Sequence, residues 1–162
     1  MNSSAKNTKE SAMETRYLIM PNHTNHQGTA FGGTIMSWID MIAAMVAQKH
    51  CGREVVTVCV ERITFESPVN IGDHLILKSS MNYVGNTSME VGVSVIKENP
   101  FTGECVKTTS AYLTFVALDE NKKPAKVPQL IIETEEEQRR FDNAKIRAES
   151  RKELLKKLKK KE

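Results

Sequence analysis

The sequence lacks several features by which common protein classes are recognised. Its 162 residues include three cysteines, Cys51, Cys59 and Cys105, with no CxxC pair. A disulfide framework or a zinc ribbon is therefore not expected, and a reducing, cytoplasmic compartment fits this usage. The first fourteen residues show no apolar secretory segment, and the longest apolar stretch is shorter than the ~18–20 residues that span a bilayer. We expect a soluble protein without stable insertion into a membrane.

Nucleotide-binding motifs and a basic nucleic-acid-binding face are also missing. Neither GxGxxG nor GxxxxGK[ST] occurs. The formal net charge of +3 resides in residues 131–162, which leaves residues 1–130 neutral. Because nucleic-acid-binding domains contact phosphates through a basic surface, no nucleic-acid partner is expected. The hydrophobic fraction of 40% predicts an ordinary folded domain instead.

The order of apolar segments and turns predicts one early helix followed by an antiparallel meander. Residues 1–13 are expected to be a disordered leader and residues 16–20 a short first strand. The apolar run from Thr34 to Ala47 predicts a helix that begins at Gly32-Gly33 and ends near Gly52. Such an order is typical of an α+β protein whose helix covers one face of the sheet. Four further strands are expected, at residues 55–65, 74–83, 88–97 and 104–118.

We expect residues 14–130 to form this domain and residues 131–162 to form a charged C-terminal helix. Residues 122–128 contain two prolines, and Thr134 followed by three glutamates is typical of a capping box. A solvated helix, or one that docks on another subunit, is the favoured interpretation, and a role toward an anionic surface is the alternative. The tail carries a weak apolar stripe formed by Phe141, Ala144, Ala148, Leu155 and Leu158.

Asp40 is the one ionisable residue in the apolar run from Thr34 to Ala47. Because apolar residues run nearly all round this helix, we expect it to be buried. A buried carboxylate needs compensation for its lost hydration, so Asp40 is either a satisfied structural acid or the centre of an active site. Gly33 lies on the same face at the helix N-terminus, where unpaired amides attract anions. At ~1.5 Å per residue the two are about 10 Å apart, so a shared site would pair residues of two subunits.

Other polar residues have simpler structural interpretations. Asn25 is typical of an Asx-turn or a cap. His23 and His26 form an H-x-x-H pair, but no third ligand at suitable spacing follows, so no metal site is expected. Ser37 lacks the G-x-S-x-G context of a nucleophile. The turn from Gly85 to Ser88 exposes amides and hydroxyls suited to a phosphate, although a plain hairpin turn is the simpler interpretation.

Residues 20–40, MPNHTNHQGTAFGGTIMSWID, resemble the acyl-CoA hydrolases of the hotdog-fold superfamily. The closest group is the bacterial and brain-type cytosolic acyl-CoA thioesterases. The specific part is the spacing Asn-x-x-Gly-x-x-x-Gly-Gly…Asp, and the resemblance covers roughly residues 14–130. Further matching segments are residues 55–58 (VVTV), 65–73 (FESPVNIGD), 84–88 (VGNTS), 114–119 (TFVALD) and 127–128 (VP).

The resemblance implies a hotdog fold, in which an antiparallel sheet of five to six strands wraps one long buried helix. It also implies a homo-oligomer, in which dimers form by joining two sheets edge to edge and commonly assemble into a trimer of dimers. Asp40 and Asn25 match the family's catalytic carboxylate and asparagine, which meet across the dimer interface. This arrangement agrees with the distance between Asp40 and Gly33.

The implied reaction is hydrolysis of an acyl-CoA thioester to free fatty acid and CoA, with no other cofactor. Asp40 would act as general base on water or as a nucleophile that forms an anhydride. Asn25 would orient the water or the substrate carbonyl, and the amide of Gly33 or of a neighbour at the helix N-terminus would stabilise the oxyanion. The expected CoA contacts are Thr57, Gly85, Asn86, Thr87 and Ser88.

Two other functions remain open at this point. The first is a hydroxyacyl-thioester dehydratase of the same fold, although His23 and His26 do not follow the dehydratase pattern. The second is an acyl-CoA sensor without catalysis. Such a protein usually carries an added DNA-binding module, for which the lysine-rich tail is the only candidate in this sequence. Release of a free thiol from acyl-CoA separates hydrolysis from both.

Overall fold

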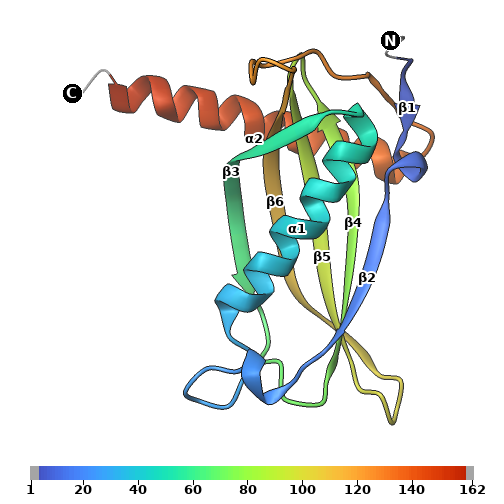
Figure 1. Cartoon of the computed structure of the whole chain (residues 1–162), viewed down its shortest axis with the longest axis vertical. Coiled ribbons are helices and arrows are strands. Elements are labelled where there is room, and N and C mark those ends of the chain that lie inside the picture. Colours follow the sequence, from blue (N-terminus) through green and yellow to red (C-terminus); the bar gives the residue numbers. More distant parts are fainter. Residues whose placement is uncertain (1–3, 160–162) are drawn as a thin grey trace.

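The computed structural model describes residues 4–159 of the chain. Five antiparallel strands form one sheet in the order β2-β4-β5-β6-β3. Helix α1 lies against one face of this sheet and helix α2 crosses the other (Figure 1). Within the described residues, neither helix is long and apolar enough to cross a membrane. The bounds of the elements are β1 Lys6–Asn7, β2 Met13–Leu18, α1 Gly32–Cys51, β3 Glu54–Phe65, β4 His74–Val84, β5 Ser88–Glu98, β6 Cys105–Leu118, β7 Leu130–Ile131 and α2 Glu135–Lys159.

The predicted α+β architecture is confirmed, and the four long strands agree with their predicted bounds to within one residue. Turn residues flank each of these strands, so the ends of the strands can be recognised in the sequence. Strand β2 begins earlier than predicted because Met13 already pairs with Ser79 of β4. It ends earlier because the chain turns at Pro21, in a short 3-10 helix.

The core lies between α1 and the sheet face that contacts it, which we term the inner face. Alternate residues of β5 and β6 point inward, as their spacing predicts. The opposite, outer face carries the polar alternates and α2. The buried inner residues of these two strands include Met89, Val91, Val93, Val95, Leu113, Phe115 and Ala117.

Helix α1 is buried on one side only, which corrects the expectation that it is buried all round. Ile39 and Ile42 face the sheet and are 0% and 1% exposed, whereas Met36, Met41 and Met45 are 44–50% exposed. A single sheet contacts one side of a helix, so the apolar residues on the other side remain uncovered in one chain. The helix ends as predicted, with Gly52 in the left-handed conformation at φ 65°.

Residues 6–13 are ordered, which corrects the prediction of a disordered leader over residues 1–13; residues 1–3 lie outside the described range. Strand β1 pairs in parallel with β7, and a capping box between Asn7 and Glu10 starts the next turn. The hydroxyl of the buried Thr8 donates to Glu137 at the start of α2. Polar contacts to a segment more than a hundred residues away therefore order this region, and local composition does not reveal them.

Helix α2 begins with the predicted capping box, because Thr134 and Glu137 each accept a hydrogen bond from the other's amide. Its docking on the outer face depends on charge more than on the predicted apolar stripe. Arg147 donates two hydrogen bonds to Glu90, which is 4% exposed, at 3.1 and 2.6 Å. The same guanidinium lies 3.7 Å from the ring centroid of Tyr112. A buried carboxylate on β5 thus fixes the position of the helix.

His50 generates a prediction about the pH dependence of stability. The side chain is fully buried near the end of α1, where Nε2–H donates to the carbonyl of Pro128 at 3.0 Å. Burial lowers the pKa of His50 below 6.5, and its Nδ1 has no partner among the described residues. The unfolded chain therefore binds a proton more readily, so stability is lost as pH falls through 6.5 toward the folded-state pKa.

We expect wild type to lose roughly 1 kcal/mol more of its unfolding free energy than His50→Gln between about pH 7.5 and 5.5. Urea unfolding at equal protein concentration measures both. Parallel pH profiles for the two proteins would show that His50 does not carry this dependence.

The Arg147–Glu90 pair generates a second stability prediction. Arg147→Ala leaves the Glu90 carboxylate buried without its cation, so the unfolding free energy should fall by roughly 3 kcal/mol. The matched control is Arg139→Ala, which breaks an exposed pair with Glu136 on the same helix and should change stability little. Equal effects of the two substitutions in chemical denaturation would contradict this account of how α2 docks.

Candidate active site

Asp40 lies at the boundary between the covered and the uncovered side of α1. Its side chain is half-buried, and its Oδ1 accepts a hydrogen bond of 2.9 Å from the hydroxyl of Thr57 on β3. Within the described residues, Oδ2 has no hydrogen-bond partner. One carboxylate oxygen is therefore fixed, while the other is available to a ligand or to water.

Thr57 lies on β3, the strand at one edge of the sheet. Within residues 4–159, strand β3 pairs with β6 alone, so its other edge is open. Thr57 is paired with the buried Phe115, and it shares the inner face with that residue, toward α1. The pairing of β3 with β6 is irregular between Thr57 and Cys59, immediately after this pair. Bulges of this kind re-aim side chains at sheet edges.

The resemblance implies that Thr57 contacts CoA, and it gives no sign of the hydrogen bond to Asp40. The two residues are 17 positions apart, in different elements, so no local pattern reports their contact.

Asn25 is held within its own loop, between the short 3-10 helix and α1. Its Oδ1 accepts from the amides of Gln27 at 2.9 Å and Thr29 at 3.3 Å, and its Nδ2 lies 3.2 Å from the hydroxyl of Thr29. This is the Asx-type turn that the sequence favours for an asparagine here. Gly28, at φ 77°, supplies the left-handed residue that closes the loop. The structure fixes the loop but does not bring Asn25 into hydrogen-bond contact with Asp40 in one chain.

The N-terminus of α1 carries an unused donor. The amides of Thr34 and Ile35 both donate to the carbonyl of Phe31, whereas the amide of Gly33 has no acceptor within the described residues. A Cβ at Gly33 would lie 2.5 Å from a ring carbon of Phe31, so the glycine permits the ring to lie over the first turn. With the helix dipole, this amide is suited to bind an anion.

Exposed apolar side chains occur on the uncovered side of α1, which carries Asp40, and on the open edge strand β3. Each of these side chains is at least 44% exposed. Monomeric proteins rarely leave a continuous apolar surface of this kind, so a second surface is expected to cover it. These residues are Phe31 at the N-cap of α1, Met36, Met41, Met45, Val58, Val60 and Phe65.

The turn from Gly85 to Ser88 lies at the far end of the sheet from Gly33. Ser88 pairs with Val116 at the end of β6, beside the residues that begin β3. The carbonyls of Asn86 and Thr87 accept from the amides of Val127 and Ala117, at 3.1 and 3.0 Å. A single chain therefore does not bring this turn to the N-terminus of α1.

The remaining candidates have structural roles. His23 accepts a hydrogen bond from the amide of Met20 and packs edge-on against Trp38, with ring centroids 5.0 Å apart. No cluster of three metal-ligating side chains occurs within residues 4–159. The hydroxyl of Ser37 donates to the carbonyl of Thr34. Cys51, Cys59 and Cys105 are unpaired thiols, and burial raises the pKa of Cys51.

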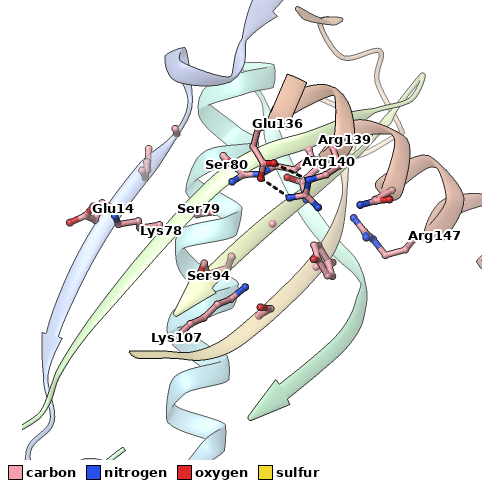
Figure 2. A pocket seen from close by; sticks show the side chains of 18 residues that line it. Glu14, Lys78, Ser79, Ser80, Ser94, Lys107, Glu136, Arg139, Arg140 and Arg147 are labelled. Atoms are coloured by element: carbon pink, nitrogen blue, oxygen red, sulfur yellow. Dashed lines mark hydrogen bonds and ion pairs between the residues drawn. The ribbon is translucent and has the colours of Figure 1, made fainter. Parts of the chain in front are cut away.

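Two hollows on the surface of residues 4–159 bear on the site, and neither is lined by Asp40. A shallow one of about 380 Å³ adjoins the Asn25 loop, between Gly32, Ile35 and Phe65. A larger groove of about 650 Å³ lies on the outer face beneath α2 (Figure 2). In that groove Glu136 is paired with Arg139 and Arg140 (Figure 2). The first hollow lies beside the N-terminus of α1, and the second lies on the outer face of the sheet, opposite to α1. Of the two, the first adjoins the candidate site.

Comparison with known proteins identifies the family. Residues 27–104 match the sequence model of the thioesterase superfamily. The acyl-CoA thioester hydrolase YkhA of Bacillus subtilis, described as uncharacterized, is 44% identical over 144 residues, which are 89% of this chain and 84% of YkhA. The chain belongs to the thioesterase superfamily. The resemblance drawn from residues 20–40 is thereby confirmed, and so is the hotdog fold.

Solved structures of this superfamily superpose closely on the chain. An apo-hexameric acyl-CoA thioesterase has a TM-score of 0.90 at 41% identity, covering 94% of this chain and 97% of that one. The acyl-CoA hydrolase of Staphylococcus aureus, solved with butyryl coenzyme A and coenzyme A, has a TM-score of 0.90 at 38% identity, covering 96% and 95%.

Three further structures of the S. aureus enzyme carry alanine in place of an aspartate, an asparagine and a threonine. The separations along the chain between those three replaced residues equal the separations between Asp40, Asn25 and Thr57 here.

Proposed function

We propose that the chain hydrolyses acyl-CoA thioesters to a free carboxylic acid and CoA, with Asp40 as the catalytic carboxylate. The observation that carries this proposal is the geometry of Asp40. It is the single carboxylate in an apolar helix, it is held through one oxygen by Thr57, and it lies on a surface that one chain leaves open. The relatives named as acyl-CoA thioester hydrolases, and the matching spacing of the three replaced residues, support the same assignment.

Asp40 performs the reaction in one of two ways. As a general base, its free Oδ2 accepts a proton while water forms a bond to the thioester carbon. As a nucleophile, Oδ2 bonds to that carbon and water then hydrolyses the anhydride. In both routes the carbon–sulfur bond breaks and a proton from water ends on the CoA thiol. Thr57 fixes the carboxylate so that one defined oxygen points to the substrate.

The oxyanion that forms during either route needs donors that Asp40 cannot supply. The amide of Gly33 is unpaired and lies at the positive end of the α1 dipole, which suits this role. It is about 10 Å along the helix from Asp40. The site therefore combines Asp40 of one subunit with Gly33 and Asn25 of another, and Asn25 orients the water or the carbonyl.

A two-fold dimer through the open edge of β3 satisfies this requirement. In antiparallel pairing, the Glu54 end of one β3 lies beside the Phe65 end of the other. The Phe65 end adjoins the N-terminus of α1, because a Cβ at Gly32 would lie 3.4 Å from the Phe65 ring. The Gly85–Ser88 turn of one subunit then lies at the same end of the dimer as Gly33 of the other. In this arrangement its amides and hydroxyls contact the pantetheine or phosphates of CoA.

The acyl chain enters between α1 and the sheet. The hollow beside Ile35, Phe65 and Val69 is largely apolar and adjoins the helix N-terminus, where the thioester carbonyl binds. No step of this mechanism uses a metal ion or another cofactor. We further propose a trimer of such dimers, since the structural neighbours include hexameric thioesterases. We also propose a cytoplasmic location, since relatives from rat, mouse and human are named as cytosolic.

The experiment that tests the proposed function is thiol release from a chain-length series of acyl-CoAs. We expect Asp40→Asn to lower kcat by at least about a hundredfold, because either route needs the ionised carboxylate. Asn25→Ala should have a smaller effect of the same sign. Turnover that is unchanged in Asp40→Asn would overturn the assignment. Acyl-CoA binding without thiol release by wild type would favour a sensor, and hydration of an enoyl thioester would favour a dehydratase.

Thr57 provides a graded test of the same site. Thr57→Val removes the hydroxyl that holds Asp40 and should lower kcat about tenfold, the equivalent of one hydrogen bond to a charged group. Thr57→Ser retains the hydroxyl and serves as the matched control, with activity near that of wild type. If the valine and serine variants are equally active, the hydrogen bond does not position the carboxylate.

A further inference from the structure

The C-terminal end of α2 projects past the edge of the sheet on which the helix is docked (Figure 1). Three arginines of α2 contact strands that lie progressively nearer that edge. Arg140 donates to Ser80 on β4, Arg147 to Glu90 on β5, and Arg151 to Glu61 on β3, the last strand. The helix continues from there to Lys159. At ~1.5 Å per residue this segment is about 12 Å long, which spans roughly two strand spacings of ~4.8 Å.

The side of α2 that faces the sheet continues into this projecting segment, residues 152–159, which we term the arm. Ala144 is fully buried against the sheet, and Arg147 and Arg151 follow it at spacings of three and four residues. The same spacing reaches three leucines of the arm, so they extend the sheet-facing stripe beyond the sheet. Lys152, Lys156 and Lys157 of the arm lie on its other sides, whereas Lys159 borders the stripe. These leucines are Leu154, Leu155 and Leu158, which are 57%, 51% and 53% exposed.

We propose that the arm packs on the outer face of a second copy of this chain, across the β3 edge. This inference rests on the proposed dimer, in which the second copy's sheet continues in the direction of the arm. The outer face of β3 offers apolar atoms for the leucines. Cys59 lies opposite Thr114, whose hydroxyl accepts from Arg151, and Val56 lies opposite Val116 on the same face. By symmetry, two arms clamp the two halves of the dimer from the outer side.

A lipid surface is the competing partner for a helix with leucines and lysines. The geometry favours the second copy, because the leucine stripe faces the plane that the chain's own sheet occupies. A membrane in that plane would have to replace the contact of α2 with Glu90 and Glu61. Lys152, Lys156 and Lys157, which would contact anionic headgroups, lie on other sides of the helix than the leucine stripe.

The first test compares dissociation of the dimer in Leu155→Glu and in Ile146→Glu. Ile146 is 60% exposed on the opposite side of α2, so it is the matched control. We expect Leu155→Glu to raise the dimer dissociation constant at least about tenfold, measured by sedimentation over a dilution series, and Ile146→Glu to leave it unchanged. An unchanged constant in Leu155→Glu, in protein that remains folded, would overturn the proposal.

The second test locates the contact directly. A benzophenone amino acid at position 155 or at position 146 is photolysed in oligomers that mix unlabelled and ¹⁵N-labelled chains. We expect position 155 to give cross-links between light and heavy chains that map to β3, and position 146 to give none. Cross-links confined to one chain would contradict the arm. So would binding to anionic phosphatidylglycerol vesicles that Leu155→Glu abolishes without affecting the dimer.

The failure of this inference is distinguishable from failure of the proposed function. A wild-type chain that is monomeric at all concentrations would contradict both the proposed site between subunits and the proposed contact of the arm. A wild-type oligomer with thioesterase activity whose dissociation is insensitive to Leu155→Glu would remove the arm alone.

Discussion

A five-stranded sheet covers only one side of α1, and the rest of the structure depends on this one-sided coverage. The covered side supplies the core, through side chains such as Ile39 and Ile42. The uncovered side presents methionines, the edge of β3 and the carboxylate of Asp40. Because apolar surface of this extent is unfavourable in water, association with a second copy is the expected way to cover it. The same association completes the proposed active site.

The one-sided coverage of α1 also explains why the proposed catalytic groups are spread along one chain. The helix holds Gly33 and Asp40 about two turns apart, at a distance that one small carbonyl does not bridge. The Gly85–Ser88 turn lies at the other end of the sheet. A two-fold axis at the β3 edge reverses the second chain and brings opposite ends together. Distances that argue against a site in one chain therefore argue for a site between two.

The outer layer is organised by a different interaction. Helix α2 has few apolar residues, and its position is fixed by arginines that reach acidic groups on the sheet. Glu90 is buried at 4% exposure, so its pairing with Arg147 is costly to break even though it adds little net stability over an apolar contact. Directional pairs of this kind favour one orientation of the helix. That orientation points the leucines of the arm across the sheet edge.

Much of this fold is predictable from the sequence, because its strands alternate cleanly and its turns contain glycine, proline or asparagine. The glycine that terminates α1, Gly52, and the capping box at Thr134 are local signals of the same kind. The order of residues 6–13 and the Arg147–Glu90 pair were not predictable, since each depends on a partner distant in sequence. For the site, Asp40 stands out because a carboxylate in an apolar helix is costly. Its bond to Thr57 appears only when the edge strand is placed in space.

The central claim is that each active site takes Asp40 from one subunit and Asn25 from another. Mixed oligomers of Asp40→Asn and Asn25→Ala chains, formed by co-expression and assayed for thiol release, test it most directly. Random pairing in a two-fold dimer leaves about a quarter of the sites with both residues intact, so the mixture should regain roughly that fraction of wild-type activity. Mixtures of Asp40→Asn with the doubly substituted chain provide a control that should stay inactive. Mixed oligomers that form but stay as inactive as their parents would contradict a shared site.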